Sequence, residues 1–250
     1  MLIVGFLLGL MLALFAGTLG WFKIPGQTNY FLAIDIAFQI LLITEILGLI
    51  FVLPRSVADS VGKQFEILSI ILLRSAFKEF GKFDQPVEWS GLHYDPLIYM
   101  LSDAFGALVI FLIIGFYYKK QRHVRITQTD QEQDEFAQFK QVLALILLII
   151  FLYLGGVDLI RFVQTGHYED SFNLFYTVLI FADILILLFS LRYSSRYYNL
   201  FRYSSFALAT ILIRLSLTAP PFLNIALGIT AGLFVLGLTI IYNFFLQKEG

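Results

Sequence analysis

Two acidic residues of this chain lie inside strongly apolar segments, where a charge could hold helices together or pass a proton. Glu45 and Asp183 are each followed by an arginine in the next apolar segment, Arg74 and Arg214. An isolated charge near mid-membrane costs roughly 3 kcal/mol or more, so such residues face the protein interior and pair. Helical rise places each arginine within reach of its acid. We predict the pairs Glu45–Arg74 and Asp183–Arg214, either as structural ion pairs or as stations of a proton or ion relay.

A third acid, Asp103, lies in another apolar segment and has no acidic counterpart elsewhere in the chain. The internal repeat described next places Gly228 opposite it. An acid that the repeat does not share is less expected to belong to a common scaffold. Asp103 is therefore our candidate for an ion or proton site, with a hydrogen bond to Ser102 or to a neighbouring helix as the alternative interpretation.

The paired charges recur because the chain repeats itself. Shifting residues 14–56 by 138 positions aligns Lys23 with Arg161 and Glu45 with Asp183, and a shift of 140 aligns ILLR at 71–74 with ILIR at 211–214. Repetition of this kind is typical of membrane proteins built from two related units. We expect a first unit at residues 1–118, a charged cytoplasmic linker at 119–137 and a second unit at 138–250.

Composition places these units in a membrane. The chain is 59% hydrophobic and 14% charged, with a mean hydropathy of +0.82, whereas soluble domains are about 25% charged. Segments long enough to cross about 30 Å of hydrocarbon as helices are Leu2–Phe22, Tyr30–Leu53, Leu97–Tyr118, Phe139–Ile160, Phe172–Leu191 and Phe222–Leu246. Two shorter segments, Phe65–Phe77 and Leu200–Leu217, carry the arginines and occupy equivalent places in the repeat.

The distribution of basic residues decides whether the short segments span. If both do, eleven lysines and arginines lie on the side of the linker and four lie opposite; if neither does, the split is seven to ten. Only the first arrangement satisfies the positive-inside rule. We therefore predict an all-α integral membrane protein with eight transmembrane helices, arranged as two parallel four-helix repeats with both termini cytoplasmic.

The chain lacks the residues that several classes of site require. There is no cysteine, and the three histidines lack the spacing of metal ligands. No catalytic set, phosphate-binding glycine loop or K⁺ filter is present, and a formal charge of -1 gives no field for nucleic acid. We expect no catalytic residues, no metal and no cofactor.

Two further motifs indicate lipid contact and close helix packing. Arg192, Arg196 and Arg202 lie in a basic, aromatic stretch between two apolar segments, which favours either arginines reaching to the membrane interface or contact with anionic lipid headgroups. Gly228 and Gly232 form a GxxxG motif, GITAG, which is typical of closely packed helices.

The second half resembles a known family. The segment RYSSFALATILIR at residues 202–214, followed by Pro220-Pro221 and the last apolar segment, is similar to the end of the phosphate-starvation-inducible E family of four-helix bacterial inner-membrane proteins. Residues 139–246 correspond to one such unit and residues 2–118 to a divergent second copy. The chain departs from that family in its doubling, in its long outer loop at Phe83–Asp95 and in its charged linker. The resemblance implies a bacterial inner membrane and supplies no catalytic residues.

The sequence is compatible with three functions. The first is a non-enzymatic membrane module that self-assembles or serves as an accessory subunit of a membrane complex, with the bilayer and other membrane subunits as its partners. The second is a proton or small-ion conductor that uses the acid–arginine pairs and Asp103. The third is an enzyme acting on lipid, and only the aromatic loop around Arg196 supports it.

Overall fold

The computed structural model describes residues 31–54, 56–80, 94–121, 130–165, 172–190, 192 and 197–249. Within them the chain is entirely α-helical. The helices are α2 (Phe31–Val52), α3 (Val57–Phe80), α4 (Tyr94–Lys120), α5 (Asp130–Thr165), α6 (Phe172–Ser190), α7 (Tyr197–Thr218) and α8 (Leu223–Glu249). The first predicted span, Leu2–Phe22, lies outside the described residues.

Four of these seven helices are long and apolar enough to cross a membrane. The qualifying stretches are Tyr94–Lys120, Asp130–Asp158, Tyr197–Thr218 and Leu223–Phe245, and they support a membrane protein. The predicted count of eight spans is not supported. The described apolar parts of α2 and α6, Ile40–Val52 and Leu174–Ser190, are short, and α3 contains acidic and basic side chains along its length.

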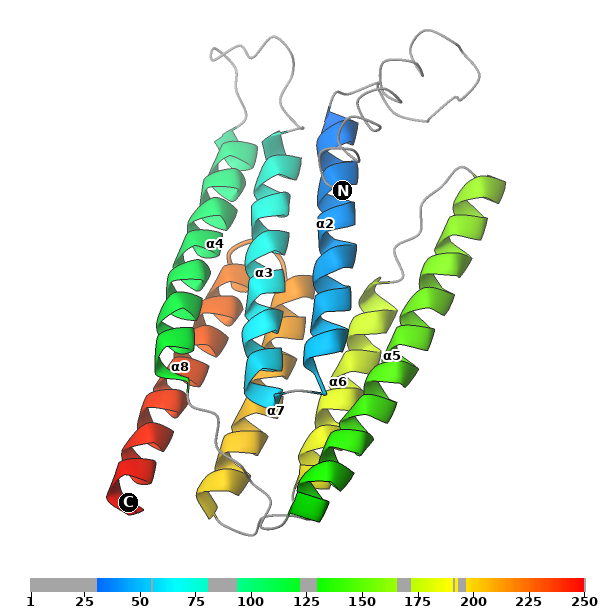
Figure 1. Ribbon diagram of the computed structural model, residues 1–250. Helices are drawn as coiled ribbons and strands as arrows, with labels where there is room; N and C mark the ends of the chain where they lie inside the picture. The colour runs from blue at the N-terminus through cyan, green and yellow to red at the C-terminus, as the bar shows by residue number, and fades with distance from the viewer. Residues whose placement is uncertain are drawn as a thin grey trace, which may run out of the picture.

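Consecutive helices run in opposite directions (Figure 1). As a result α2, α4, α6 and α8 point one way, and α3, α5 and α7 point the other. Helices at equivalent places in the repeat, such as α3 and α7, therefore run in the same direction. We call the end of the molecule at which α2 joins α3 the α2–α3 end; α4 finishes there and α5 starts there (Figure 1).

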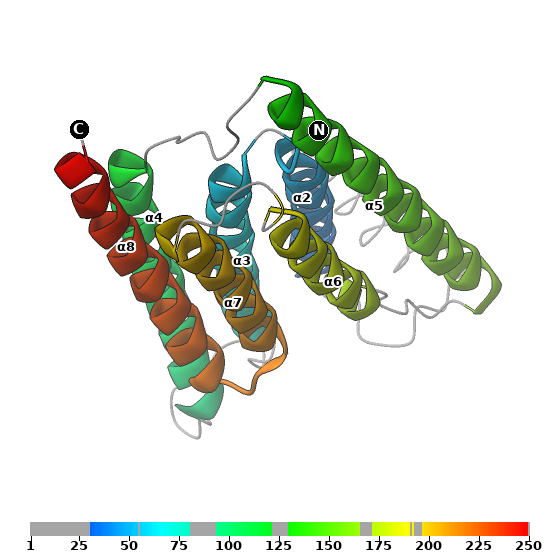
Figure 2. The same cartoon turned by 90° about the horizontal axis from the view of Figure 1, so that it is seen from below.

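The apolar core consists of two clusters, and each draws on both halves of the chain. One lies among α3, α4, α7 and α8 and includes Leu68, Ile110, Ile213 and Ala231. The other lies among α2, α5 and α6 and takes Ile67 from α3. Figure 2 shows the same division, with α4 and α8 on one side and α2, α5 and α6 on the other. Because α3 contributes to both clusters, it lies between the two groups of helices.

Glycines allow α4 and α8 to pack closely. A Cβ atom added at Gly106 of α4 would lie 2.7 Å from Ile225 of α8, and one at Gly228 would lie 3.0 Å from Ile110. A Cβ at Gly232 would lie 3.1 Å from Ile113. The close packing predicted from the GITAG motif is confirmed, and its partner helix is α4.

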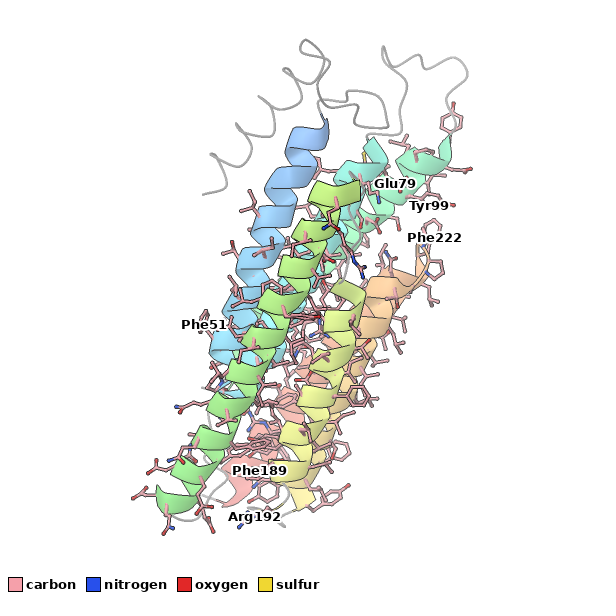
Figure 3. The ribbon with its side chains drawn as sticks, turned by 90° about the vertical axis from the view of Figure 1, so that its right-hand side faces the viewer. Phe51, Glu79, Tyr99, Phe189, Arg192 and Phe222 are labelled. Carbon is pink, nitrogen blue, oxygen red and sulfur yellow. The ribbon has the colours of Figure 1, made fainter. Side chains whose placement is uncertain are left out.

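The connection between α7 and α8 is short and locally strained. Phe222 has a φ of 70°, a left-handed conformation that is unfavourable for a bulky residue. Its ring packs edge-on against Tyr99 of α4, with 5.5 Å between the ring centroids (Figure 3). The Ser216 hydroxyl donates a hydrogen bond to the backbone carbonyl of Asn224 at 2.6 Å. These contacts hold the end of α7 and the start of α8 against α4.

Candidate functional site

Polar side chains from three helices meet in the interior around Asp183. We call this set the Asp183 cluster: Asp183 on α6, Thr210 and Arg214 on α7, and Ser60 and Gln64 on α3. Residues four apart share one face of a helix, so Ser60 and Gln64 form one polar strip and Thr210 and Arg214 form another. Because α7 packs against both α3 and α6, the two strips and the acid are brought together.

Asp183 has partners on α3 and on α7. The Gln64 side-chain nitrogen Nε2 donates a hydrogen bond to Asp183 Oδ2 at 3.4 Å, and the Thr210 hydroxyl lies beside the carboxylate. Asp183 and Arg214 are close enough to interact electrostatically. The structure thus places one predicted acid near its predicted arginine, and it adds a glutamine from the other half of the chain.

Arg214 is buried, and its guanidinium group has little hydrogen bonding. The residue is 4% exposed, and within the described part of the chain none of its three guanidinium nitrogens has a hydrogen-bond partner. The guanidinium carbon lies 5.0 Å from the centroid of the Tyr176 ring, a cation–π distance. A buried cation with this little hydrogen bonding is costly, and the nearby charge of Asp183 offsets part of that cost.

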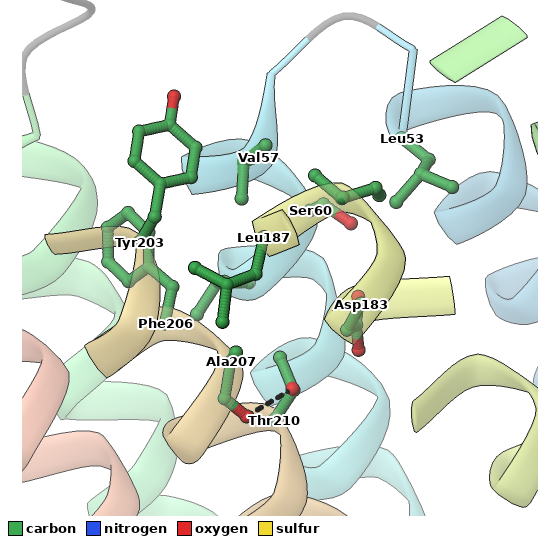
Figure 4. A pocket seen from close by; sticks show the side chains of 11 residues that line it. Leu53, Val57, Ser60, Asp183, Leu187, Tyr203, Phe206, Ala207 and Thr210 are labelled. Carbon is green, nitrogen blue, oxygen red and sulfur yellow. Dashed lines mark hydrogen bonds between the residues drawn. The ribbon is translucent and has the colours of Figure 1, made fainter. Parts of the chain in front are cut away.

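A small cavity lies beside Asp183 (Figure 4). It has room for about one water molecule. Four of its lining side chains carry oxygen atoms: Ser60, Asp183, Tyr203 and Thr210. The remaining lining is apolar and includes Leu53, Val57, Leu187 and Phe206. Ser60 is buried, and its hydroxyl oxygen has no hydrogen-bond partner among the described residues.

Glu45, the other predicted acid, forms a salt bridge with Lys63 of α3. The same Lys63 ammonium donates a hydrogen bond to Glu66 Oε2 at 2.8 Å, and the Tyr118 hydroxyl donates to Glu66 Oε1 at 2.7 Å. We call Glu45, Lys63, Glu66 and Tyr118 the Lys63 network. It joins α2, α3 and α4, and its charged side chains retain between 18% and 34% of their exposure.

The predicted partner of Glu45 was Arg74 and not Lys63. Arg74 lies eleven residues after Lys63 on α3, which corresponds to about 16 Å of helical rise. Lys63 was missed because the topology argument counted it among the basic residues outside the bilayer. The signal available in the sequence was the spacing of Lys63 and Glu66, which places both on one face of a helix. A contact between Arg74 and Glu45 stays a prediction.

Asp103 lies at the boundary between α4 and α8. It is 5% exposed, and the Asn224 side-chain nitrogen Nδ2 donates a hydrogen bond to its Oδ1 at 3.1 Å. This contact fits the alternative interpretation of a hydrogen bond to a neighbouring helix. Asn224 was not predicted as a partner of Asp103, because an uncharged residue after the Pro220-Pro221 turn carries no distinctive signal in the sequence.

The three arginines predicted to lie at the membrane interface, Arg192, Arg196 and Arg202, have different surroundings. Arg202 is 7% exposed and stacks over Tyr242, with 4.2 Å between the guanidinium carbon and the ring centroid; this leaves little of its surface for a lipid headgroup. Arg192 is exposed and lies near one end of α6 (Figure 3). Arg196 lies outside the described residues. Headgroup contact stays a prediction for these arginines.

Within the described residues, no three His, Asp or Glu side chains gather closely enough to hold a metal ion. Comparison of the chain with family models, with curated proteins and with solved structures found no match. The function proposed below therefore depends on the geometry of the chain itself.

Proposed function

We propose that this protein is a non-enzymatic multi-pass membrane module that serves as an assembling or accessory subunit of a membrane complex. One observation carries the proposal: the acids inside the apolar segments join helices to one another. Glu45 links α2 to α3, Asp183 links α6 to α3, and Asp103 links α4 to α8. Charged groups used in this way stabilise an arrangement of helices and need no substrate.

The test is purification from native membranes in a mild detergent, followed by cross-linking and mass spectrometry. An accessory subunit should co-purify with stoichiometric membrane partners, and an assembling module should run as a defined homo-oligomer. Isolation as a monomer under several detergents would count against the proposal.

A second candidate, a proton or small-ion conductor, has one specific observation in its favour. Arg214 and Ser60 carry buried polar atoms that lack hydrogen-bond partners within the described residues, and a cavity lies beside Asp183. Purified protein in liposomes would then show an ion flux above that of empty vesicles. Asp183→Asn should abolish this flux, whereas Lys78→Met, at an exposed position of α3, should leave it intact. A flux abolished only by Asp103→Asn would shift the conducting site to the α4–α8 boundary.

We also propose the finer topology derived from the sequence: eight transmembrane helices in two parallel four-helix repeats, both termini cytoplasmic, in a bacterial inner membrane. The shared direction of α3 and α7 supports the parallel repeats (Figure 1). The resemblance to the phosphate-starvation-inducible E family supports the bacterial inner membrane. With that topology the α2–α3 end faces the cytoplasm.

A further inference from the structure

The cavity beside Asp183 combines polar groups that need partners with a volume that suits a small molecule. The hydroxyl oxygen of Ser60 lacks a hydrogen-bond partner within the described residues. Thr210 donates its hydroxyl proton to the backbone carbonyl of Ala207 at 2.8 Å (Figure 4), so its oxygen lone pairs remain free to accept. Asp183 lines the same space and retains part of its accessible surface although it lies deep among the helices.

These groups match the requirements of a bound water molecule. Internal cavities that stay empty are apolar, whereas a buried water needs two to four polar partners and room for about one probe sphere. A water here can accept a hydrogen bond from Ser60 and donate one to Thr210 and one to Asp183. The opposite charges of Asp183 and Arg214 interact with each other, so a neutral polar occupant adds no net charge to this part of the interior.

Water can approach this cavity from one end of the molecule. Leu53 directly follows α2, and Val57 begins α3. The partly exposed members of the lining are Val57, Asp183, Leu187 and Tyr203. In the opposite direction, beyond Gln64 and Arg214, the next turns present apolar side chains. Buried Ile67, Phe175 and Leu179 belong to one apolar cluster, and Ile71 and Leu217 pack against it.

We propose that the cavity between α3, α6 and α7 is a water site that hydrates Asp183 from the α2–α3 end, and that the apolar layer beyond Arg214 keeps the opposite side dry. The inference goes beyond the proposed function, because a structural module does not require a hydrated acid. It gives the buried carboxylate contact with solvent on one side only.

X-ray radiolytic footprinting in lipid nanodiscs tests this directly, because hydroxyl radicals formed from bound water oxidise the side chains next to it. Two phenylalanines provide a matched pair. Phe206 is 2% exposed and lines the cavity, whereas Phe175 is 1% exposed and lies in the apolar layer. We expect several-fold faster oxidation of Phe206 than of Phe175, since only Phe206 borders a site able to hold water.

A cavity-filling variant supplies the control. Ala207→Val adds two methyl groups to a residue that lines the cavity and should lower the oxidation rate of Phe206 to that of Phe175. Ser60→Ala removes a polar partner of the water without adding volume. It should lower the rate of Phe206 oxidation while changing the packing around the cavity little. Three results would overturn the proposal: equal and slow oxidation of both phenylalanines, equal and fast oxidation of both, or an unchanged rate at Phe206 in Ser60→Ala.

Discussion

At the scale of single residues, the charge clusters around Lys63 and around Asp183 each join side chains from three helices. Lys63 contacts two carboxylates, Glu45 and Glu66, and Glu66 also accepts a hydrogen bond from Tyr118. Asp183 has Gln64 and Arg214 as partners on different helices. Removing one member of such a set therefore changes the environment of groups on at least two helices.

Replacing Lys63 should destabilise the protein more than replacing Glu45. Lys63→Met leaves two carboxylates facing each other without a cation, and we expect a loss of about 1 to 3 kcal/mol in the free energy of unfolding. Glu45→Gln retains the Lys63–Glu66 contact and should cost less. Combining the two changes should cost less than the sum of the single losses. Thermal unfolding in detergent measures the three values, with Lys78→Met as the exposed control on the same helix.

The Asp183 cluster gives a sharper coupling because both charges lie deep among the helices. Asp183→Asn preserves an acceptor for Gln64 but leaves the buried Arg214 cation without the Asp183 charge, and we expect a cost of about 3 to 5 kcal/mol. Arg214→Met strands the acid and should cost a similar amount. The double variant should recover most of that loss, since two uncharged side chains of similar size fill the same space. Additive losses in the double variant would show that the two residues are not coupled.

At the scale of helices, α3 holds the molecule together. It packs against α2, α4, α7 and α8 and contributes Lys63 to one polar set and Gln64 to another. Adjacent residues on a helix point about 100° apart, so Lys63 can face α2 while Gln64 faces α6 and α7. The charged and polar side chains of α3 lower its hydropathy below that of a typical membrane span. Lys63 and Gln64 show that such side chains contact the neighbouring helices.

Contact between α4 and α8 should depend on the absence of a side chain at Gly106. A Cβ there would lie 2.7 Å from Ile225, against the branched part of that side chain, so Gly106→Ala should destabilise the protein by about 1 to 3 kcal/mol. Gly115→Ala on the same helix has no atom within 4 Å of its Cβ and should be neutral or stabilising by up to about 1 kcal/mol. Melting temperatures of the two variants compare them directly. Equal shifts would contradict the packing explanation.

At the scale of the whole molecule, the sequence predicted the helices better than their partners. The apolar segments from Tyr30 onward each correspond to a helix, and the two short segments proved to be parts of longer helices, α3 and α7. Hydropathy recognises such segments because the bilayer forces backbone groups to bond within a helix. It carries no information about which faces meet, so it missed Lys63 as the partner of Glu45 and Gln64 as a partner of Asp183.

Side-specific labelling should show the start of α4 and the start of α5 on opposite sides of the membrane. Asp95 and Gln131 are both exposed, and Figure 1 places the start of α5 at the α2–α3 end and the start of α4 at the other. Because the chain contains no cysteine, Asp95→Cys and Gln131→Cys each introduce a single reactive thiol. A membrane-impermeant maleimide added to intact cells should label the first variant, and the second should react only after the membrane is opened. The excess of lysine and arginine on the side of the linker predicts this orientation. The reverse pattern would show that the chain is inverted in the membrane, and labelling of both variants in intact cells would contradict the directions of the helices themselves.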